Sequence, residues 1–395
     1  MGPLTSPLTE GEDTVWFRHS DSLPAAARSA ARQLARRIGL LPERVAEVEL
    51  AVSEAATNLR RHAVDGAMVL RVVRTDAEAA LEFVTVDSGP GMADVPAALA
   101  DGYSSALSLG IGLGAVSRLA DAFDLHSLPG RGTVLTARFW NRTPAGRAAV
   151  AGGEPVAAGL TRPMSGQELC GDAWATRPVG PAPAGPLPGG PDPHRPATTA
   201  ARLDWSVLTN RTHRTHPSPG PGRADAAGAF LLMFCDGLGH GPLAARAASD
   251  AVAAFHRSTA YLPEQVLSDL HLALRTGRGG AVAVALVEPA AARLTFCGVG
   301  NVSAFLVDTA TGARRSLPSA PGIVGHQLRA PHTVRQELPP GSAVVLHSDG
   351  LTDRWKPSDV PGLFAHLPVT TAALLLREAG VRRDDAGVVV ARGAW

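Results

Sequence analysis

The chain has 395 residues, which leaves room for two or three domains. Its 37 basic and 36 acidic residues give a formal net charge of +1, so the charge balance favours neither nucleic acid nor an anionic membrane as a partner. Lys356 is the only lysine, which excludes a Walker P-loop and a protein-kinase site, because both need a lysine at the phosphates.

The start of the chain and its cysteines predict a cytoplasmic protein. The first residues lack a basic stretch followed by an apolar core, so we expect no signal peptide, and we expect residues 1–14 to form a flexible tail. No apolar run reaches ~18 residues, the length that a membrane-spanning helix needs. Cys170, Cys235 and Cys297 are isolated from one another in sequence, which favours a reducing compartment.

Residues 15–140 predict one domain in which helices alternate with strands. Ser22 is suited to the N-cap of the first helix, and Gly39 to its C-terminal stop. The predicted elements are, in chain order, helices at 22–39 and from 42, strands at 67–74 and 81–86, a helix from 114 and a strand at 133–140. Helices interspersed with antiparallel strands predict an α/β two-layer sandwich.

Residues 141–160 are rich in Ala and Gly and predict a linker to a second domain at 161–395. Within that domain, a Pro/Gly-rich segment at about 176–226 predicts a disordered insertion in a surface loop. The predicted elements there are strands at 229–236, 281–288, 293–300, 343–349 and 386–392, and helices at 242–256 and 263–275. Many strands with a few helices predict an α+β fold, a β-sandwich flanked by helices.

Three polar residues of the first domain are candidates for nucleotide binding. Glu54 and Asn58 are four residues apart on a helix, so both side chains emerge on one face, where they can orient water and hold Mg²⁺. Asp87 follows a strand and can accept a hydrogen bond from an exocyclic amine such as that of adenine. A solvated helix face and an ordinary turn are the alternative interpretations.

Glycine clusters follow Asp87. Gly89 and Gly91 allow the backbone to approach a flat base, and the segment 110–114, GIGLG, opens a helix whose N-terminal amides can bind phosphate. A later glycine turn is followed by the hydroxyl of Thr133. The GIGLG segment is not a Rossmann fingerprint, because it does not open the first βαβ unit.

Together, the motifs ExxxN, DSGPGM, GIGLG and GRGT resemble the GHKL ATPase family, and most of all its anti-sigma-factor serine kinases of the switch-kinase type. The resemblance implies a Bergerat fold that binds ATP with Mg²⁺. It makes Glu54 the general base for a substrate serine, Asn58 the Mg²⁺ ligand and Asp87 the adenine reader. It also places at the nucleotide Thr133 and the glycines of the pocket floor and lid, which are Gly89, Gly91, Gly110, Gly112 and Gly114.

Four segments of the second domain carry an aspartate at the end of an apolar run or beside a glycine. The aspartates are Asp172, Asp236, Asp349 and the pair Asp384 and Asp385. Carboxylates that converge without Cys or His ligands favour hard ions such as Mg²⁺ or Mn²⁺, and a two-metal site of this kind hydrolyses phosphate esters. Taken alone, each segment is more typical of a hairpin turn, and the prediction depends on all four together.

The same four segments resemble the SpoIIE-type branch of the metal-dependent serine/threonine phosphatases, over about residues 161–395. The resemblance implies two Mn²⁺ or Mg²⁺ ions that activate water for in-line attack on phosphoserine. By this resemblance, Asp236 would bridge both ions, the carbonyl of Gly237 would bind one, Asp349 and Asp384 would hold the other, and Asp172 would orient water or a further ion. Asp384 is favoured over Asp385 because the family pattern puts the ligand first, although Ala386 and Gly387 depart from that pattern.

The two resemblances imply a signalling enzyme in a sigma-factor partner-switching system, whose substrate is a phosphorylated STAS-domain antagonist. If both domains are active, one adds phosphate to a serine and the other removes it. The alternative is that the N-terminal domain transfers no phosphate. It then binds ATP and a partner protein and regulates the phosphatase.

Overall fold

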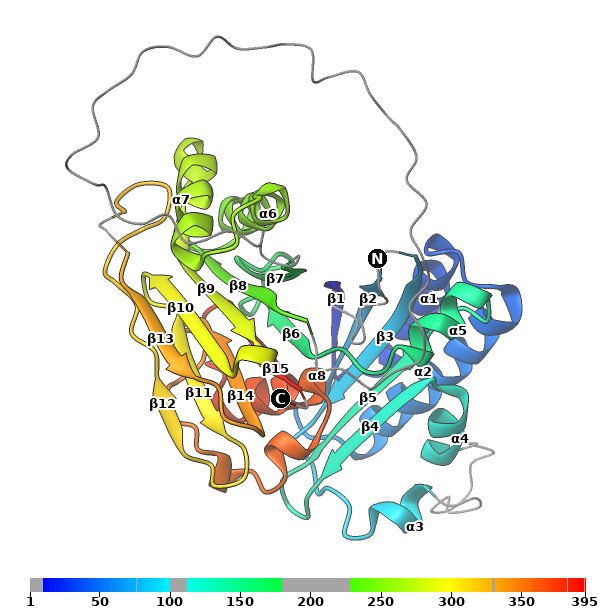
Figure 1. Cartoon of the computed structure of the whole chain (residues 1–395). Helices are drawn as coiled ribbons and strands as arrows, with labels where there is room; N and C mark the ends of the chain where they lie inside the picture. Colours follow the sequence, from blue (N-terminus) through cyan, green and yellow to red (C-terminus); the bar gives the residue numbers. More distant parts are fainter. Residues whose placement is uncertain are drawn as a thin grey trace, which may run out of the picture.

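The structure is a computed structural model of the whole chain, and it describes residues 10–75, 77–99, 112–179, 228–328, 331–381, 383–393 and 395. These residues form an α/β two-layer sandwich followed by a β-sandwich with helices on both outer faces (Figure 1). The predicted fold class is therefore confirmed. Within the described ranges, no helix is both long enough and apolar enough to cross a membrane.

The N-terminal domain consists of an antiparallel sheet with helices on one face. Its elements are β1 (Glu10–Arg18), α1 (Leu23–Arg37), α2 (Pro42–His62), β2 (Ala67–Arg74), β3 (Ala79–Val86), α3 (Val95–Leu99), α4 (Gly112–Leu119), β4 (Ala122–Ser127) and β5 (Thr133–Phe139). The strand order is β1-β2-β3-β5-β4. The helix α2 begins at a proline, and the apolar residues Val45, Val48, Val52 and Leu59 recur on one face and are buried against the sheet.

The predicted boundaries of this domain need correction at both ends. The strand β1 begins at Glu10, inside the predicted flexible tail, and pairs antiparallel with β2, where Trp16 lies opposite Val69. The predicted linker contains a helix, α5 (Pro144–Ala151), and the next strand begins at Ala157. Both elements owe their order to tertiary contacts: the partner of β1 lies about fifty residues away, and α5 packs through Ala149 against Trp140 and its neighbours.

The C-terminal domain is a sandwich of two antiparallel sheets. Its strands are β6 (Ala157–Arg162), β7 (Asp172–Pro178), β8 (Phe230–Gly237), β9 (Gly280–Glu288), β10 (Arg293–Val299), β11 (Ser303–Asp308), β12 (Arg314–Ser316), β13 (Thr333–Glu337), β14 (Ser342–His347) and β15 (Ala386–Arg392). Its helices are α6 (Pro242–Arg257), α7 (Pro263–Ala273) and α8 (Pro368–Ala379), with short 3₁₀ turns at 274–276, 289–291, 357–359 and 363–365.

The strand orders of the two sheets are β13-β10-β9-β8-β7 and β12-β11-β14-β15-β6. The helices α6 and α7 cover the first sheet, and α8 covers the second. The predicted insertion begins later than expected, because residues up to Pro178 belong to β7, and residues 180–227 lie outside the described residues. The strands on either side of that segment, β7 and β8, pair directly with each other.

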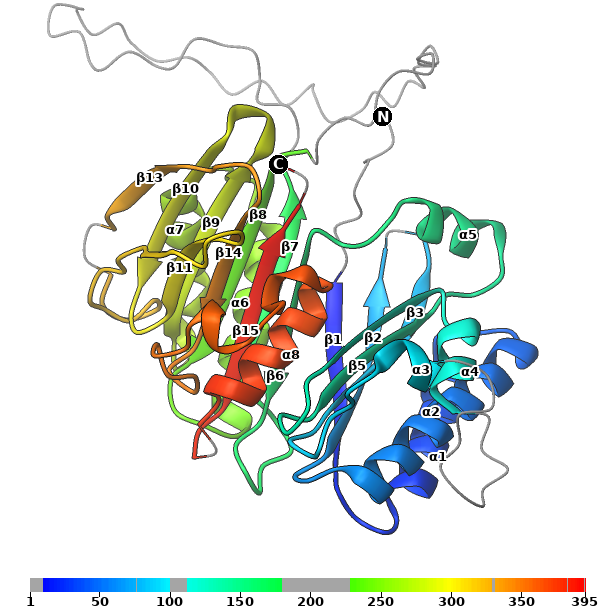
Figure 2. The ribbon, with the colours of Figure 1, turned by 90° about the horizontal axis from the view of Figure 1, so that it is seen from below.

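The helix α8 joins the two domains. Its buried side chains pack on the second sheet of the sandwich and also on Val69, Val84 and Val134 of the N-terminal sheet. Figure 2 shows α8 lying between β15 and β6 on one side and the N-terminal sheet on the other. The face of the N-terminal sheet that α1 and α2 leave uncovered is thus buried by the C-terminal domain.

Candidate functional site

The predicted nucleotide-binding residues of the first domain lie on α2 and after β3. Glu54 and Asn58 are both half-buried on α2, on turns whose buried residues face the sheet. Asp87 directly follows β3, and its Oδ1 accepts a hydrogen bond of 2.7 Å from the amide of Gly89. Burial raises the pKa of Asp87 above its ordinary value, and the Gly89 amide and the Arg377 guanidinium oppose this shift.

The backbone around Asp87 is packed so closely that side chains would not fit. A Cβ on Gly91 would lie 2.0 Å from the carbonyl oxygen of Leu128, and a Cβ on Gly132 would lie 2.0 Å from that of Asp87. Both glycines also have positive φ angles, of 65° and 79°. Two glycine-rich turns therefore meet at the end of β3, next to Asp87.

Of the remaining predicted residues of this site, Thr133, Gly112 and Gly114 are described by the structure and Gly110 is not. The Oγ1 of Thr133 lies 2.9 Å from the Oγ of Ser127, so the hydroxyl already has a partner within the domain. Gly112 and Gly114 begin α4. Gly110 lies outside the described residues.

The predicted metal ligands of the second domain lie at one end of the sandwich. Asp172 is the first residue of β7 and lies opposite Asp236, near the end of the antiparallel strand β8. Asp349 follows β14, and Asp384 precedes β15, which pairs antiparallel with β14. Because antiparallel neighbours begin and end at the same edge, Asp172 and Asp236 share the edge of one sheet, and Asp349 and Asp384 share the edge of the other. A hydrogen bond from Ser348 to Asp172 joins the two edges.

Hydrogen bonds to two of these carboxylates fix their orientation. Oδ2 of Asp172 accepts a hydrogen bond of 2.6 Å from the hydroxyl of Ser348, whereas Oδ1 is buried without a hydrogen-bond partner. Oδ2 of Asp349 accepts one of 2.6 Å from the side-chain amide of Asn301. The sequence motifs gave Ser348 no role. Asn301 belongs to the glycine turn that connects β10 to β11.

The electrostatics of the cluster favour a cation. Burial, followed by the charge of Asp236, raises the pKa of Asp172 well above its ordinary value. Burial, followed by the charges of Asp349, Asp384 and Asp385, raises the pKa of Asp236 to about 7. A divalent ion would relieve both the mutual repulsion and the lack of a partner for Asp172 Oδ1.

The structure separates the neighbours Asp384 and Asp385. Both carboxylate oxygens of Asp385 accept backbone hydrogen bonds of 2.7 Å, from the amides of Met164 and Gly171, and the residue is buried. Asp384 is exposed, and its Oδ1 accepts a hydrogen bond from the amide of Asp385. Asp385 therefore holds the 164–171 loop, which leaves Asp384 available to an ion.

Carboxylate and carbonyl oxygens are suitable ligands for hard divalent ions, although the carboxylates do not converge on one ion position in this structure. In the described part of the chain, no three His, Cys, Asp or Glu side chains are close enough to enclose an ion. Glycine fits closely at position 387, because a Cβ there would lie 2.9 Å from the Cβ of Asp172.

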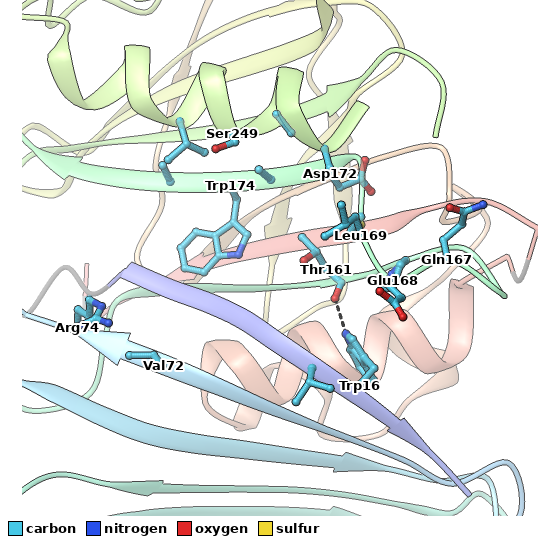
Figure 3. Close-up of a pocket in the computed structure, with 18 of the residues that line it drawn as sticks. Trp16, Val72, Arg74, Thr161, Gln167, Glu168, Leu169, Asp172, Trp174 and Ser249 are labelled. Carbon is cyan, nitrogen blue, oxygen red and sulfur yellow. Dashed lines mark hydrogen bonds between the residues drawn. The ribbon is translucent and has the colours of Figure 1, made fainter. Parts of the chain in front are cut away.

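A cavity of about 900 Å³ lies beside this cluster, between β1 of the first domain and β7 and α6 of the second. Asp172 is at one end of it, and the indole of Trp174 enters it (Figure 3). On the opposite side, Trp16 donates a hydrogen bond of 2.8 Å from Nε1 to the carbonyl of Thr161. The cavity could not be predicted from sequence, because its two walls come from different domains.

Comparison with known proteins identifies both domains. Residues 19–139 match the model of the histidine kinase-like ATPase domain, and residues 226–392 match that of stage II sporulation protein E (SpoIIE). The serine/threonine-protein kinase RsbT of Bacillus subtilis is 35% identical over 117 residues, which are 30% of this chain and 88% of that protein. An anti-sigma F factor of Caldanaerobacter subterraneus is 29% identical over 115 residues, 28% of this chain and 79% of that protein.

Among solved structures, the PP2C phosphatase domain of Bacillus subtilis SpoIIE with a fragment of its regulatory domain aligns with a TM-score of 0.43 at 12% identity. That alignment covers 94% of this chain and 95% of the other. The chain belongs to the histidine kinase-like ATPase family through its N-terminal domain, and its C-terminal domain is a SpoIIE domain. It is thus an enzyme of the serine/threonine phosphatase class with a kinase-like domain, and these domain classes use a nucleotide and divalent metal ions.

Proposed function

We propose that this protein removes phosphate from phosphoserine on a STAS-domain antagonist of a partner-switching system, and that its N-terminal domain binds ATP with Mg²⁺. The observation that carries the phosphatase half is the gathering of Asp172, Asp236, Asp349 and Asp384 at one edge of the sandwich, with a buried oxygen of Asp172 unpartnered. The kinase and anti-sigma relatives of the N-terminal domain support the partner-switching half.

In this proposal the aspartates have different roles in metal binding. Asp236 serves both ions, Gly237 contributes its carbonyl, Asp349 and Asp384 hold one ion, and Asp172 orients water or a further ion. Two Mn²⁺ or Mg²⁺ ions would supply Lewis acidity to activate water and to neutralise the charge of the phosphate.

The surrounding residues keep this arrangement in place. The hydroxyl of Ser348 and the amide of Asn301 hold the carboxylates of Asp172 and Asp349. Gly237 has space for no side chain, because a Cβ there would lie 2.4 Å from the carbonyl oxygen of Ala244.

In the N-terminal domain, Asp87 reads adenine, Asn58 binds Mg²⁺ and Glu54 acts as general base towards the serine of the partner. Thr133 and the pocket glycines, which are Gly89, Gly91, Gly110, Gly112 and Gly114, contact the nucleotide. A cytoplasmic location is part of the proposal, because Cys170, Cys235 and Cys297 are isolated from one another in sequence, as is usual in a reducing compartment.

A second candidate function is favoured by the contact between α8 and the N-terminal sheet. In it, the N-terminal domain transfers no phosphate but binds ATP and a partner, and so regulates the phosphatase through the shared core. Transfer of radiolabel from ATP to a STAS protein distinguishes the two. Loss of transfer in Glu54→Ala with nucleotide binding retained supports the kinase, and no transfer by the wild-type chain supports the binding module.

The phosphatase is tested by Mn²⁺-dependent hydrolysis of p-nitrophenyl phosphate. The full chain is the right material, because the core around α8 is shared between the domains. We expect activity in the wild type and in Asp250→Asn, whose side chain is 55% exposed on α6, and none in Asp236→Asn. Equal activity in Asp236→Asn, or no Mn²⁺ binding by the wild type, would contradict the proposal.

A further inference from the structure

Two arginines and a glutamate connect the candidate nucleotide site to α8 of the phosphatase domain. Nη1 of Arg377 donates a hydrogen bond of 3.3 Å to the backbone carbonyl of Asp87, although 290 residues separate them. The Arg377 side chain is only 5% exposed, and its Nη2 lies 2.8 Å from Glu378. Glu378 in turn pairs at 2.9 Å with Arg131, from the glycine turn that closes over Asp87.

Arg377 is buried and acts on Asp87, the residue proposed to read adenine. Its guanidinium donates a hydrogen bond to the backbone carbonyl of Asp87, and its positive charge stabilises the ionised Asp87 carboxylate. A Cβ on Gly132 would lie 2.0 Å from the same carbonyl oxygen of Asp87. The backbone of Asp87 is therefore contacted both by a turn of its own domain and by a side chain of the other domain.

The same C-terminal end of α8 that carries Arg377 also contacts the segment that follows Asp349. Where α8 ends, the carbonyl of Ala379 accepts a hydrogen bond of 2.9 Å from the amide of Thr352, and the amide of Val381 donates one of 2.7 Å to the carbonyl of Gly350. Gly350 follows Asp349, and Asp384 lies five residues beyond the end of α8. The end of α8 that carries Arg377 thus hydrogen-bonds to the residues that follow Asp349 and is close in sequence to Asp384.

We propose that Arg377 is a positioning residue of the nucleotide site, supplied by the phosphatase domain, and that through α8 nucleotide binding tightens metal binding at Asp349 and Asp384. This inference rests on the proposed function of both sites. ATP that engages Asp87 favours the docked position of α8, which in turn favours one arrangement of the 349–352 and 381–384 segments. By linkage, metal must tighten nucleotide binding by the same factor.

The first test measures binding of fluorescent ATP and GTP analogues to the full chain in excess Mg²⁺. We expect Arg377→Met to weaken ATP about tenfold and to reduce the preference for ATP over GTP, because the preference depends on the placement of Asp87. Arg377→Lys should recover part of the loss. Arg246→Met is the control, since that side chain is 80% exposed on α6. Thermal unfolding confirms that each variant is folded.

The second test measures Mn²⁺ affinity of the wild type with and without ATP, at free Mn²⁺ fixed by a metal buffer. We expect at least fivefold tighter binding with ATP, a factor within the usual range of such coupling, and no such gain in Arg377→Met. Two outcomes would overturn the inference and leave the proposed function intact. One is that Arg377→Met binds ATP as tightly as the wild type, and the other is that the Mn²⁺ affinity of the wild type does not depend on ATP. A wild-type chain that binds no ATP would overturn the proposed nucleotide site as well.

Discussion

Replacing Asp236 with asparagine should stabilise the metal-free chain at pH 8 while removing metal binding. In the folded chain, burial and then neighbouring carboxylates raise the pKa of Asp236 from 3.8 to about 7. Each pKa unit corresponds to about 1.4 kcal/mol, so ionising this group in the folded state costs at most ~4 kcal/mol. Because the neighbouring carboxylates share the repulsion, we expect about 2 kcal/mol for Asp236 itself.

The sign of the effect follows from linkage. A carboxyl group whose pKa is raised by folding binds more protons in the folded state, so its ionisation destabilises the fold as pH rises. The cost is absent below about pH 4, grows up to about pH 7 and is then constant. The stability advantage of Asp236→Asn should therefore be small at pH 5 and full at pH 8.

The assay is denaturant unfolding in EDTA at pH 5 and pH 8, followed by tryptophan fluorescence, with Asp250→Asn as the matched control. No gain in stability for Asp236→Asn at pH 8, or the same gain at both pH values, would refute the electrostatic reasoning.

The same raised pKa makes protons compete with the metal ion for Asp236. The Mn²⁺ affinity should therefore fall about tenfold per pH unit below about pH 7 and level off above it.

Two further substitutions have controls within the chain. Gly132→Ala should abolish nucleotide binding, because its Cβ would lie 2.0 Å from the carbonyl oxygen of Asp87. Gly130→Ala is the control, because Gly130 also has a positive φ but a Cβ there would have no atom within 4 Å. This control should lose only about 1–2 kcal/mol of stability and should still bind the nucleotide. Thr370→Val leaves its buried partner Thr136, 3.0 Å away across the domain interface, without a hydrogen bond and should cost about 1–3 kcal/mol. The double valine variant should recover part of that cost in the same unfolding assay.

Local patterns in the sequence predicted the features that depend on local chemistry. The helix α2 followed from its apolar spacing and its initial proline, and β8 and β15 followed from apolar runs that end or begin at aspartates. The order of the glycine and aspartate motifs was sufficient to predict both domain classes, which the family matches confirm. The roles of the individual site residues stay predictions.

The elements that the sequence did not predict depend on partners far away in the chain. The edge strands β1 and β6 mix polar and apolar residues without a regular alternation, so only pairing with β2 and β15 defines them. The helix α8 is buried on nearly all sides between two sheets and so lacks the polar stripe that marks a surface helix.

The sequence by itself determined which chemistry the chain carries, because glycine turns and strand-end aspartates are local signals. Tertiary structure alone decided how those residues are used. Only the fold shows that both oxygens of Asp385 are bound by backbone amides while Asp384 is exposed. Only the fold brings Arg377 to Asp87, because a contact across 290 residues depends on how two sheets pack on one helix.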